Sequence, residues 1–244
     1  MSSNPMHQFE VYKIGPEINL GSVNLSFTNS SLFMSISAAC ILLFLFAGTK
    51  KKSLIPSKLQ LVTEMSYTFV AKMINDTAGS SAKPFFPFIF TLFMFVLFCN
   101  MVGMLPYSFT VTSHIIVTFA LAAFVFIGVT FIGFLKHGIK YLELFVPKGV
   151  PIVLLPLIVV IEIISYLSRP VSLSVRLFAN MMAGHTMMKV FGGFVISLGL
   201  LGGWLPLGFS VALTGLEILV AFLQAYVFAI LTCIYLNDAL NLHH

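Results

Sequence analysis

Seven ionisable side chains gather in the last third of a chain that is otherwise poor in charge. They lie among long apolar runs and are Glu162, Arg169, Arg176, His185, Lys189, Glu217 and Asp238. On insertion scales, one charged side chain near the centre of a bilayer costs about 2.5–3.5 kcal/mol. So many charged groups in apolar sequence therefore indicate a common function.

The spacing of the polar residues predicts two polar helix faces. Between residues 162 and 180 they step by 3, 4, 3, 4 and 4 positions, which places them on one stripe of a helix: Glu162, Ser165, Arg169, Ser172, Arg176 and Asn180. A second stripe carries Glu217, Gln224, Tyr235 and Asp238, with the small Ala221 between the first two. Two such stripes, facing each other or a third body, would form a hydrated track through lipid.

The residue types in these stripes suit proton transfer. Carboxylates and histidine accept and release protons, whereas an arginine keeps its charge and can divide a proton path into two halves. Other interpretations stay open at this stage. Glu162 and Glu217 could be structural partners of the two arginines, Arg169 and Lys189 are expected near lipid headgroups, and His185 alone would suit a packed core.

The composition predicts a membrane protein rather than a soluble one. Of 244 residues, 59% are hydrophobic and 9% are charged, whereas soluble domains are about a quarter charged. The net charge of +5 comes largely from lysines between apolar runs, which favours membrane topology signals over nucleic-acid binding. Cys40, Cys99 and Cys233 are far apart in apolar segments, so neither a disulfide framework nor a metal site is expected, and no cofactor.

The first half of the chain predicts three crossings and a surface helix. Leu32–Gly48 is a first crossing, ended by a lysine triplet at 50–52 that places the N-terminus outside. Residues 57–76 alternate charged and apolar positions at helical spacing, as in a helix that lies on the inner surface. Phe85–Pro106 and Val111–Leu135 then form a hairpin whose sparse polar residues, Asn100, Thr118 and Thr130, suit packing.

The second half predicts a long hairpin. Residues 150–194 would form a helix of about 68 Å, twice the hydrocarbon thickness, so it must tilt steeply or break near Pro170. Gly199, Gly202, Gly203 and Pro206 mark a turn before a partner helix at Val211–Leu236. The fold class is therefore all-α, polytopic, with five crossings and an inside C-terminus. Its regions are an external segment (1–30), a first crossing, surface helix and hairpin (31–149), and a proton-conducting hairpin (150–244).

One segment resembles a known family closely. The string RPVSLSVRLFANMMAGH, from Arg169 to His185, is similar to the signature of subunit a of the F-type ATP synthase membrane sector. Shorter strings extend the resemblance over nearly the whole chain, and they begin at Gln8, Ser26, Gly103, Leu223 and Tyr235. The sequences of these strings are similar to those of alphaproteobacterial and mitochondrial members.

The resemblance implies a role for each site residue. Members of this family are stators. Each sits against a rotating ring of c subunits and works with subunit b and the other ATP synthase subunits. Arg176 matches the essential arginine that faces the ring carboxylates. His185 and Glu217 match the inlet half-channel, with Asn180 and Gln224 beside the arginine, and Glu162 and Asp238 match the outlet half-channel. Ser165, Ser172 and Tyr235 complete the polar stripes. The resemblance also implies that the last hairpin lies almost along the membrane plane.

Localisation and two alternative functions complete the expectations. The N-terminus lacks the features of a cleaved signal, which favours a bacterial inner membrane over the mitochondrial one. One alternative is a self-contained ion channel or secondary transporter, although internal repeats typical of that class are not visible. The other is a purely structural subunit that anchors partner chains.

Overall fold

The structure is a computed structural model of the chain that describes residues 9–14, 19–20, 23–24, 26–50, 56–105, 108–146 and 154–241. Six long helices dominate it: α1 (Asn29–Thr49), α2 (Lys58–Ala78), α3 (Phe86–Gly103), α4 (Ile115–His137), α5 (Leu155–Gly202) and α6 (Trp204–Leu240). Short 3₁₀ turns, η2 (Ser80–Phe85), η3 (Val111–Ser113) and η4 (Gly138–Phe145), flank α3 and α4. Two-residue strands, β1 (Asn19–Leu20) and β2 (Val23–Asn24), pair in the N-terminal segment.

The prediction of an all-α polytopic membrane protein is confirmed. Within the described residues, five helical stretches are long and apolar enough to cross a membrane, and they contain α1, α3, α4, α5 and α6. The amphipathic α2 is not among them, although its position on a membrane surface stays a prediction. The lysines at 51 and 52 and the turn residue Pro106 lie outside the described residues.

The helix boundaries follow local chemistry. The side chains of Thr28 and Ser57 cap α1 and α2 by accepting hydrogen bonds from the backbone N–H groups of Ser31 and Gln60. Helix α4 begins four residues later than predicted because residues from Val111 form the 3₁₀ turn η3 instead. This difference matters, since η3 brings polar side chains against α5.

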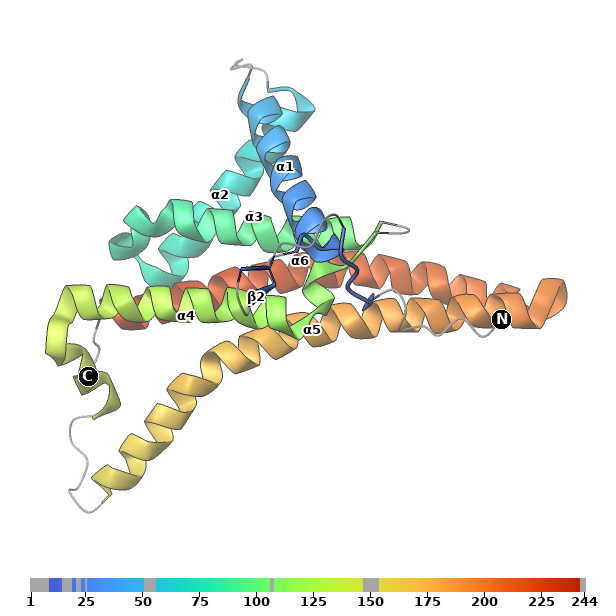
Figure 1. Ribbon diagram of the computed structural model, residues 1–244. Helices are drawn as coiled ribbons and strands as arrows, with labels where there is room; N and C mark the ends of the chain where they lie inside the picture. Colours follow the sequence, from blue (N-terminus) through green and yellow to red (C-terminus); the bar gives the residue numbers. More distant parts are fainter. Residues whose placement is uncertain are drawn as a thin grey trace.

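Helices α5 and α6 form the long hairpin that the sequence predicts (Figure 1). At 1.5 Å per residue, the 48 residues of α5 span about 70 Å. The helix continues through Pro170, so of the two alternatives the break near this proline is wrong. In Figure 1 the first part of α5 bends away from α4, which is the usual effect of a proline inside a helix. The helical geometry is interrupted at Gly199, with φ of 61°.

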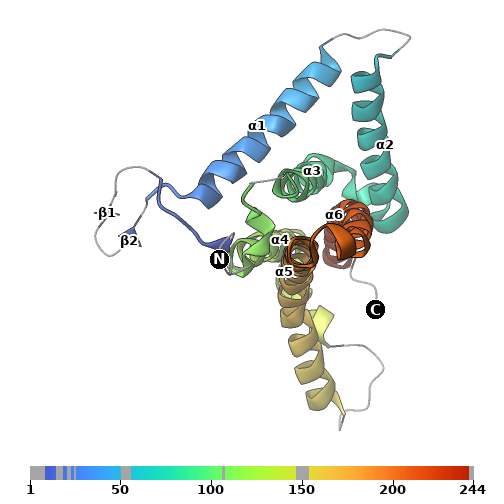
Figure 2. The same ribbon diagram turned by 90° about the vertical axis from the view of Figure 1, so that its right-hand side faces the viewer.

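Helix α6 lies at the centre of the bundle and contacts α2, α3, α4 and α5. Its buried face repeats small residues every four positions, at Ala221, Ala225, Ala229 and Cys233. Small side chains let helices approach closely where lipid gives no hydrophobic drive to association. Figure 2 looks nearly along α5 and α6 and shows α1 and α2 as a V beside this bundle.

The three polar residues expected to pack do contact neighbouring helices. The buried Asn100 on α3 donates through Nδ2 to the carbonyl oxygen of Ala221 on α6, at 3.2 Å. The hydroxyl groups of Thr118 and Thr130 on α4 lie 3.2 and 2.6 Å from those of Ser174 and Tyr166 on α5. These bonds join α3 and α4 to the long hairpin and fix its position.

Candidate functional site

Arg176 lies on the outward face of α5. Its neighbours Leu173 and Leu177, three positions before it and one after it, are buried against the bundle, whereas Arg176 is exposed. Among the described residues, no carboxylate forms an ion pair with it. The guanidinium is therefore available to a group outside this chain.

The predicted polar stripe on α5 is confirmed as one face. Ser165, Ser172 and Asn180 are exposed like Arg176, and Glu162 and Arg169 are half-buried. The adjacent face of this stretch carries the buried residues Tyr166, Leu173, Leu177 and Met181. The four exposed members of the stripe thus lie on the surface of the hairpin that the rest of the chain leaves uncovered.

Asn180 joins the stripe on α5 to the stripe on α6. Its Nδ2 donates to Oε1 of Gln224 at 2.8 Å, and the Gln224 side chain is buried. Asn180 follows Arg176 by four residues, so the two lie one turn apart on the same face. The structure therefore brings these two amides together one helical turn from the arginine on α5.

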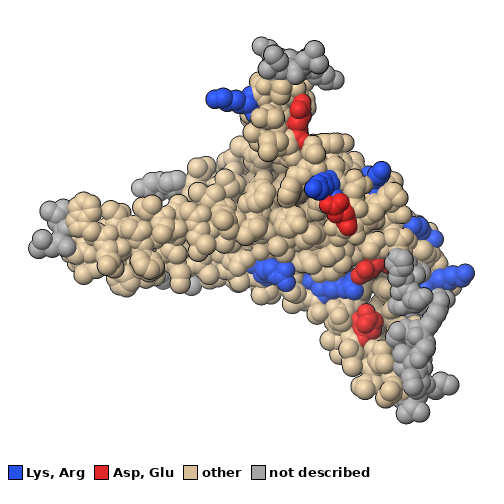
Figure 3. Space-filling view, turned by 180° about the vertical axis from the view of Figure 1, so that it is seen from behind, with Lys and Arg blue, Asp and Glu red and all other residues tan. Residues whose placement is uncertain are grey.

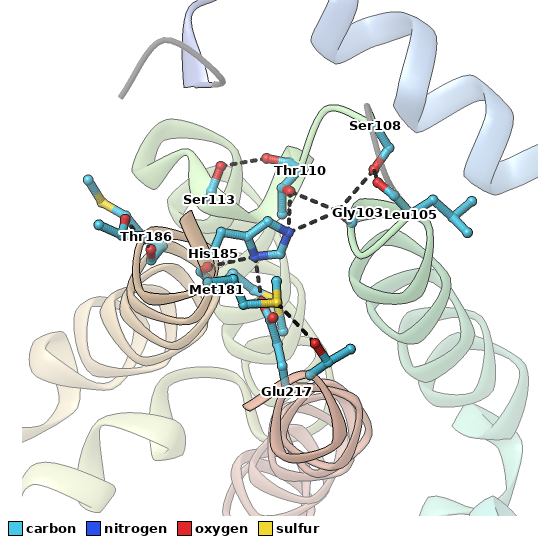
Figure 4. A network of polar contacts seen from close by, with 12 residues as sticks. Gly103, Leu105, Ser108, Thr110, Ser113, Met181, His185, Thr186 and Glu217 are labelled. Carbon is cyan, nitrogen blue, oxygen red and sulfur yellow. Dashed lines mark hydrogen bonds and ion pairs between the residues drawn. The ribbon is translucent and has the colours of Figure 1, made fainter. Parts of the chain in front are cut away.

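His185 and Glu217 form a buried pair between the two helices. Nδ1 of His185 lies 2.5 Å from Oε1 of Glu217, and 9% and 4% of the two side chains are exposed. Nδ1 also lies 3.0 Å from the carbonyl oxygen of Met181. The structure thus brings together the two residues that the family resemblance assigned to one half-channel, and His185 is packed against a carboxylate rather than in an apolar core. Figure 4 shows the imidazole between α5, α6 and the turn that follows α3.

Gly184 makes room for this pair. A Cβ atom at this position would lie 2.8 Å from Oε1 and 3.0 Å from Cδ of Glu217. Because only the end of a flexible side chain stands in the way, an added methyl group would displace the carboxylate without disrupting the helices.

We expect Gly184→Ala to lower ATP-driven proton pumping several-fold, because the added methyl group displaces the Glu217 carboxylate. The chain should still assemble, because alanine favours a helix over glycine by about 1 kcal/mol. Pumping is measured in inverted membrane vesicles with a pH-sensitive dye. Gly192→Ala on the same helix is the matched control, because its added Cβ meets nothing within 4 Å. Equal pumping by the two variants would contradict the role of this carboxylate position.

Arg169 forms an ion pair within the chain, and the expected position of Arg169 and Lys189 near lipid headgroups stays a prediction. Its guanidinium donates to Oδ2 of Asp238 on α6 at 3.0 Å, and its charge lies 5.2 and 5.0 Å from the ring centres of Tyr166 and Tyr235. The alternative that paired Glu162 and Glu217 with the two arginines is therefore wrong. The chain could pair Arg169 with Asp238 only after the hairpin brought positions 69 residues apart together.

The turn between α3 and α4 supplies contacts that sequence analysis missed. Nε2 of His185 lies 2.9 Å from both the Gly103 carbonyl oxygen and the Thr110 hydroxyl. In the same turn the His114 ring stacks on Phe109, and burial lowers the pKa of His114. A glycine, a threonine and a histidine in a turn carry no periodic signal, so the sequence offered no means of finding them.

The charged surface agrees with insertion in lipid. Seen from behind, the described surface at the tip of the α5–α6 hairpin carries no Lys, Arg, Asp or Glu, and these side chains gather toward the other end (Figure 3). The tip exposes large apolar side chains, including Ile196, Trp204 and Leu205. An apolar surface of this extent is typical of contact with lipid or with other membrane chains.

The site is thus a series of polar groups along one hairpin. In order along α5 it holds the Arg169–Asp238 pair, the free Arg176, the Asn180–Gln224 bond and the His185–Glu217 pair. Nine residues separate Arg176 from His185, about 13.5 Å along a helix. A carboxylate and an imidazole can exchange protons, and a fixed cation can attract a carboxylate while it blocks protons.

Comparisons with known proteins identify the family of the chain. The family model described as ATP synthase A chain matches residues 31–237. The chain is 80% identical over its whole length to the ATP synthase subunit a of Pelagibacter ubique, which it covers completely. It is 60% identical to that of a Chelativorans species, with both chains covered completely, and 58% identical to that of Mesorhizobium japonicum, over 99% and 98% of the two chains. The chain therefore belongs to the ATP synthase subunit a family, in its alphaproteobacterial form.

Proposed function

We propose that this chain is the stator that carries protons to and from a rotating ring of c subunits in an F-type ATP synthase. The observation that carries the proposal is the position of Arg176, an exposed cation on an apolar hairpin with no ion-pair partner among the described residues. A cation in lipid is costly unless a partner neutralises it. A carboxylate on an adjacent membrane subunit would be such a partner.

The polar groups on either side of Arg176 form two half-paths in this proposal. His185 and Glu217 lead protons in toward Asn180 and Gln224, and Glu162 and Asp238 lead them out. Ser165, Ser172 and Tyr235 support the stripe that would line the outlet. Because an arginine does not release its proton, Arg176 prevents direct transfer between the half-paths. Protons then cross only on the ring carboxylates, which move past the arginine.

The driving force is consistent with a rotary mechanism. Each proton that crosses 100 mV contributes about 2.3 kcal/mol, so several protons are required for each ATP. A ring that advances by one carboxylate per proton adds these small contributions together. The chain itself would make no ATP, and its output would be torque.

The proposal also gives the chain a membrane setting. It would lie in the bacterial inner membrane, with residues 1–30 and the N-terminus outside and the C-terminus inside. Residues 31–149 would provide the first crossing, the surface helix and the central hairpin, and residues 150–244 the proton-conducting hairpin. Its partners would be the c ring, subunit b of the peripheral stalk and membrane lipid.

Reconstitution of the purified chain alone tests the proposal against a self-contained channel. We expect liposomes that contain only this chain to conduct protons no faster than empty liposomes under a potassium-diffusion potential. Liposomes with the complete membrane sector, including the ring, are the positive control. Specific proton flux through the isolated chain would overturn the proposal, because its two half-paths are joined only by the ring.

A further inference from the structure

The imidazole of His185 is held on the side away from Glu217 by the turn that follows α3. Its Nε2 lies 2.9 Å from the carbonyl oxygen of Gly103 and 2.9 Å from Oγ1 of Thr110 (Figure 4). Thr110 is buried, and its Oγ1 donates to the same Gly103 oxygen at 3.1 Å. Three groups therefore form a small closed network behind the ring.

This network determines which nitrogen carries the fixed hydrogen. A carbonyl oxygen can only accept hydrogen bonds, so Nε2 of His185 must carry a hydrogen when it faces Gly103. Nδ1 also faces a carbonyl oxygen, that of Met181 at 3.0 Å, and in addition it contacts Oε1 of Glu217. Only a hydrogen on Nδ1 therefore has a carboxylate in contact that can take up the proton, whereas the hydrogen on Nε2 faces a carbonyl and a hydroxyl group, which do not.

Thr110 gives the hydrogen on Nε2 a second acceptor beside the Gly103 oxygen. Thr110 Oγ1 and His185 Nε2 both lie within hydrogen-bond distance of that oxygen, whereas the single hydrogen of Ser108 Oγ is shared between Gly103 at 2.9 Å and Leu105 at 2.7 Å. A hydroxyl oxygen accepts as well as donates. The Thr110 oxygen can therefore accept the Nε2 hydrogen while its own hydrogen goes to Gly103.

The surrounding structure holds the Thr110 hydroxyl in this position. A Cβ at position 103 would lie 2.8 Å from Cγ2 of Thr110, so only glycine permits this close approach. The backbone carbonyl of Thr110 accepts a hydrogen bond from Ser113 Oγ at 2.6 Å. The backbone of the threonine is thus held by Ser113, and its side chain is packed against Gly103.

We propose that Thr110 is a positioning residue for proton transfer, because its hydroxyl holds the hydrogen on Nε2 of His185 and aims Nδ1 at Glu217. This inference rests on the proposed function of the His185–Glu217 pair. In the transfer, the N–H bond at Nδ1 breaks as an O–H bond forms at Oε1 of Glu217, and the reverse step restores it. The Nε2 hydrogen stays in place throughout, so no proton passes through Thr110.

Two substitutions distinguish this role from simple packing. Thr110→Val keeps the shape of the side chain and removes the hydroxyl, whereas Thr110→Ser keeps the hydroxyl and removes the methyl group. ATP-driven proton pumping by the complete complex is measured in inverted vesicles and normalised to the amount of assembled chain. We expect Thr110→Val to lower pumping by about ten-fold, the lower end of the loss seen when metal-binding histidines lose their outer hydrogen-bond partner. Thr110→Ser should stay within about two-fold of the unmodified complex.

Each outcome decides the inference. Normal pumping by Thr110→Val, or an equal loss in both variants, would overturn it and leave packing as the role of this residue. If the Thr110→Val chain does not assemble, the variant Gly103→Ala is tested in its place. This substitution displaces the Thr110 hydroxyl and should lower pumping to a similar degree. Normal pumping by assembled Gly103→Ala would likewise overturn the inference. Failure here is distinguishable from failure of the proposed function, since that function is tested separately at Arg176 and Glu217.

Discussion

Replacement of Arg176 by alanine should reduce ATP-driven proton pumping to background while the complex still assembles. The guanidinium is exposed and has no ion-pair partner among the described residues, so its loss removes no visible support from the fold. Its loss would remove both the attraction for a ring carboxylate and the barrier between the half-paths. Loss of one preorganised charged or polar group typically costs about 10²–10³-fold in rate.

The measurement is acidification of inverted vesicles after ATP addition, with assembly followed by the amount of chain that copurifies with the complex. Lys140→Ala is the matched control, because it also removes an exposed cation but lies on η4 and is not a member of the polar stripe. We expect this control to pump normally. Normal pumping by Arg176→Ala would exclude the proposed mechanism and favour a purely structural subunit.

The second large effect is expected at Glu217. Glu217→Gln keeps the size of a side chain that is 4% exposed but removes its ability to bind and release a proton. A positioned acid or base contributes about 10²–10⁴-fold to a proton-transfer step. We therefore expect pumping to fall by about 10²-fold or more, with His185 left as the only titratable member of the pair.

An exchange of the two residues provides the control for Glu217. The pair needs one imidazole and one carboxylate in contact, and either order of the two supplies both groups. We expect His185→Glu and Glu217→His to be inactive singly and to recover a substantial part of pumping together. If the double variant is no better than either single one, the pair acts through a geometry that only the original order provides, and chemical equivalence of the two orders is wrong.

Apolar composition and helical spacing determined much of the architecture. Runs of about 20 apolar residues require helices in lipid, because a membrane cannot satisfy exposed backbone groups. The positions of five apolar stretches, the long hairpin and the outward stripe around Arg176 follow from this local requirement. The family resemblance, carried by the string from Arg169 to His185, was likewise readable from the sequence and is confirmed.

Contacts between distant segments depended on tertiary packing. Their spacing in the sequence placed Arg169 and Asp238 on helix faces. The two residues form a pair only because of the way α5 packs against α6. Likewise, 75 residues separate Thr110 from His185, and the hydrogen bonds between them exist because η3 packs against α5. Helical periodicity fixes the direction of a side chain within its own helix. The partner that it meets depends on how helices slide and cross, which small residues such as Ala221, Ala225 and Gly184 decide by permitting close approach.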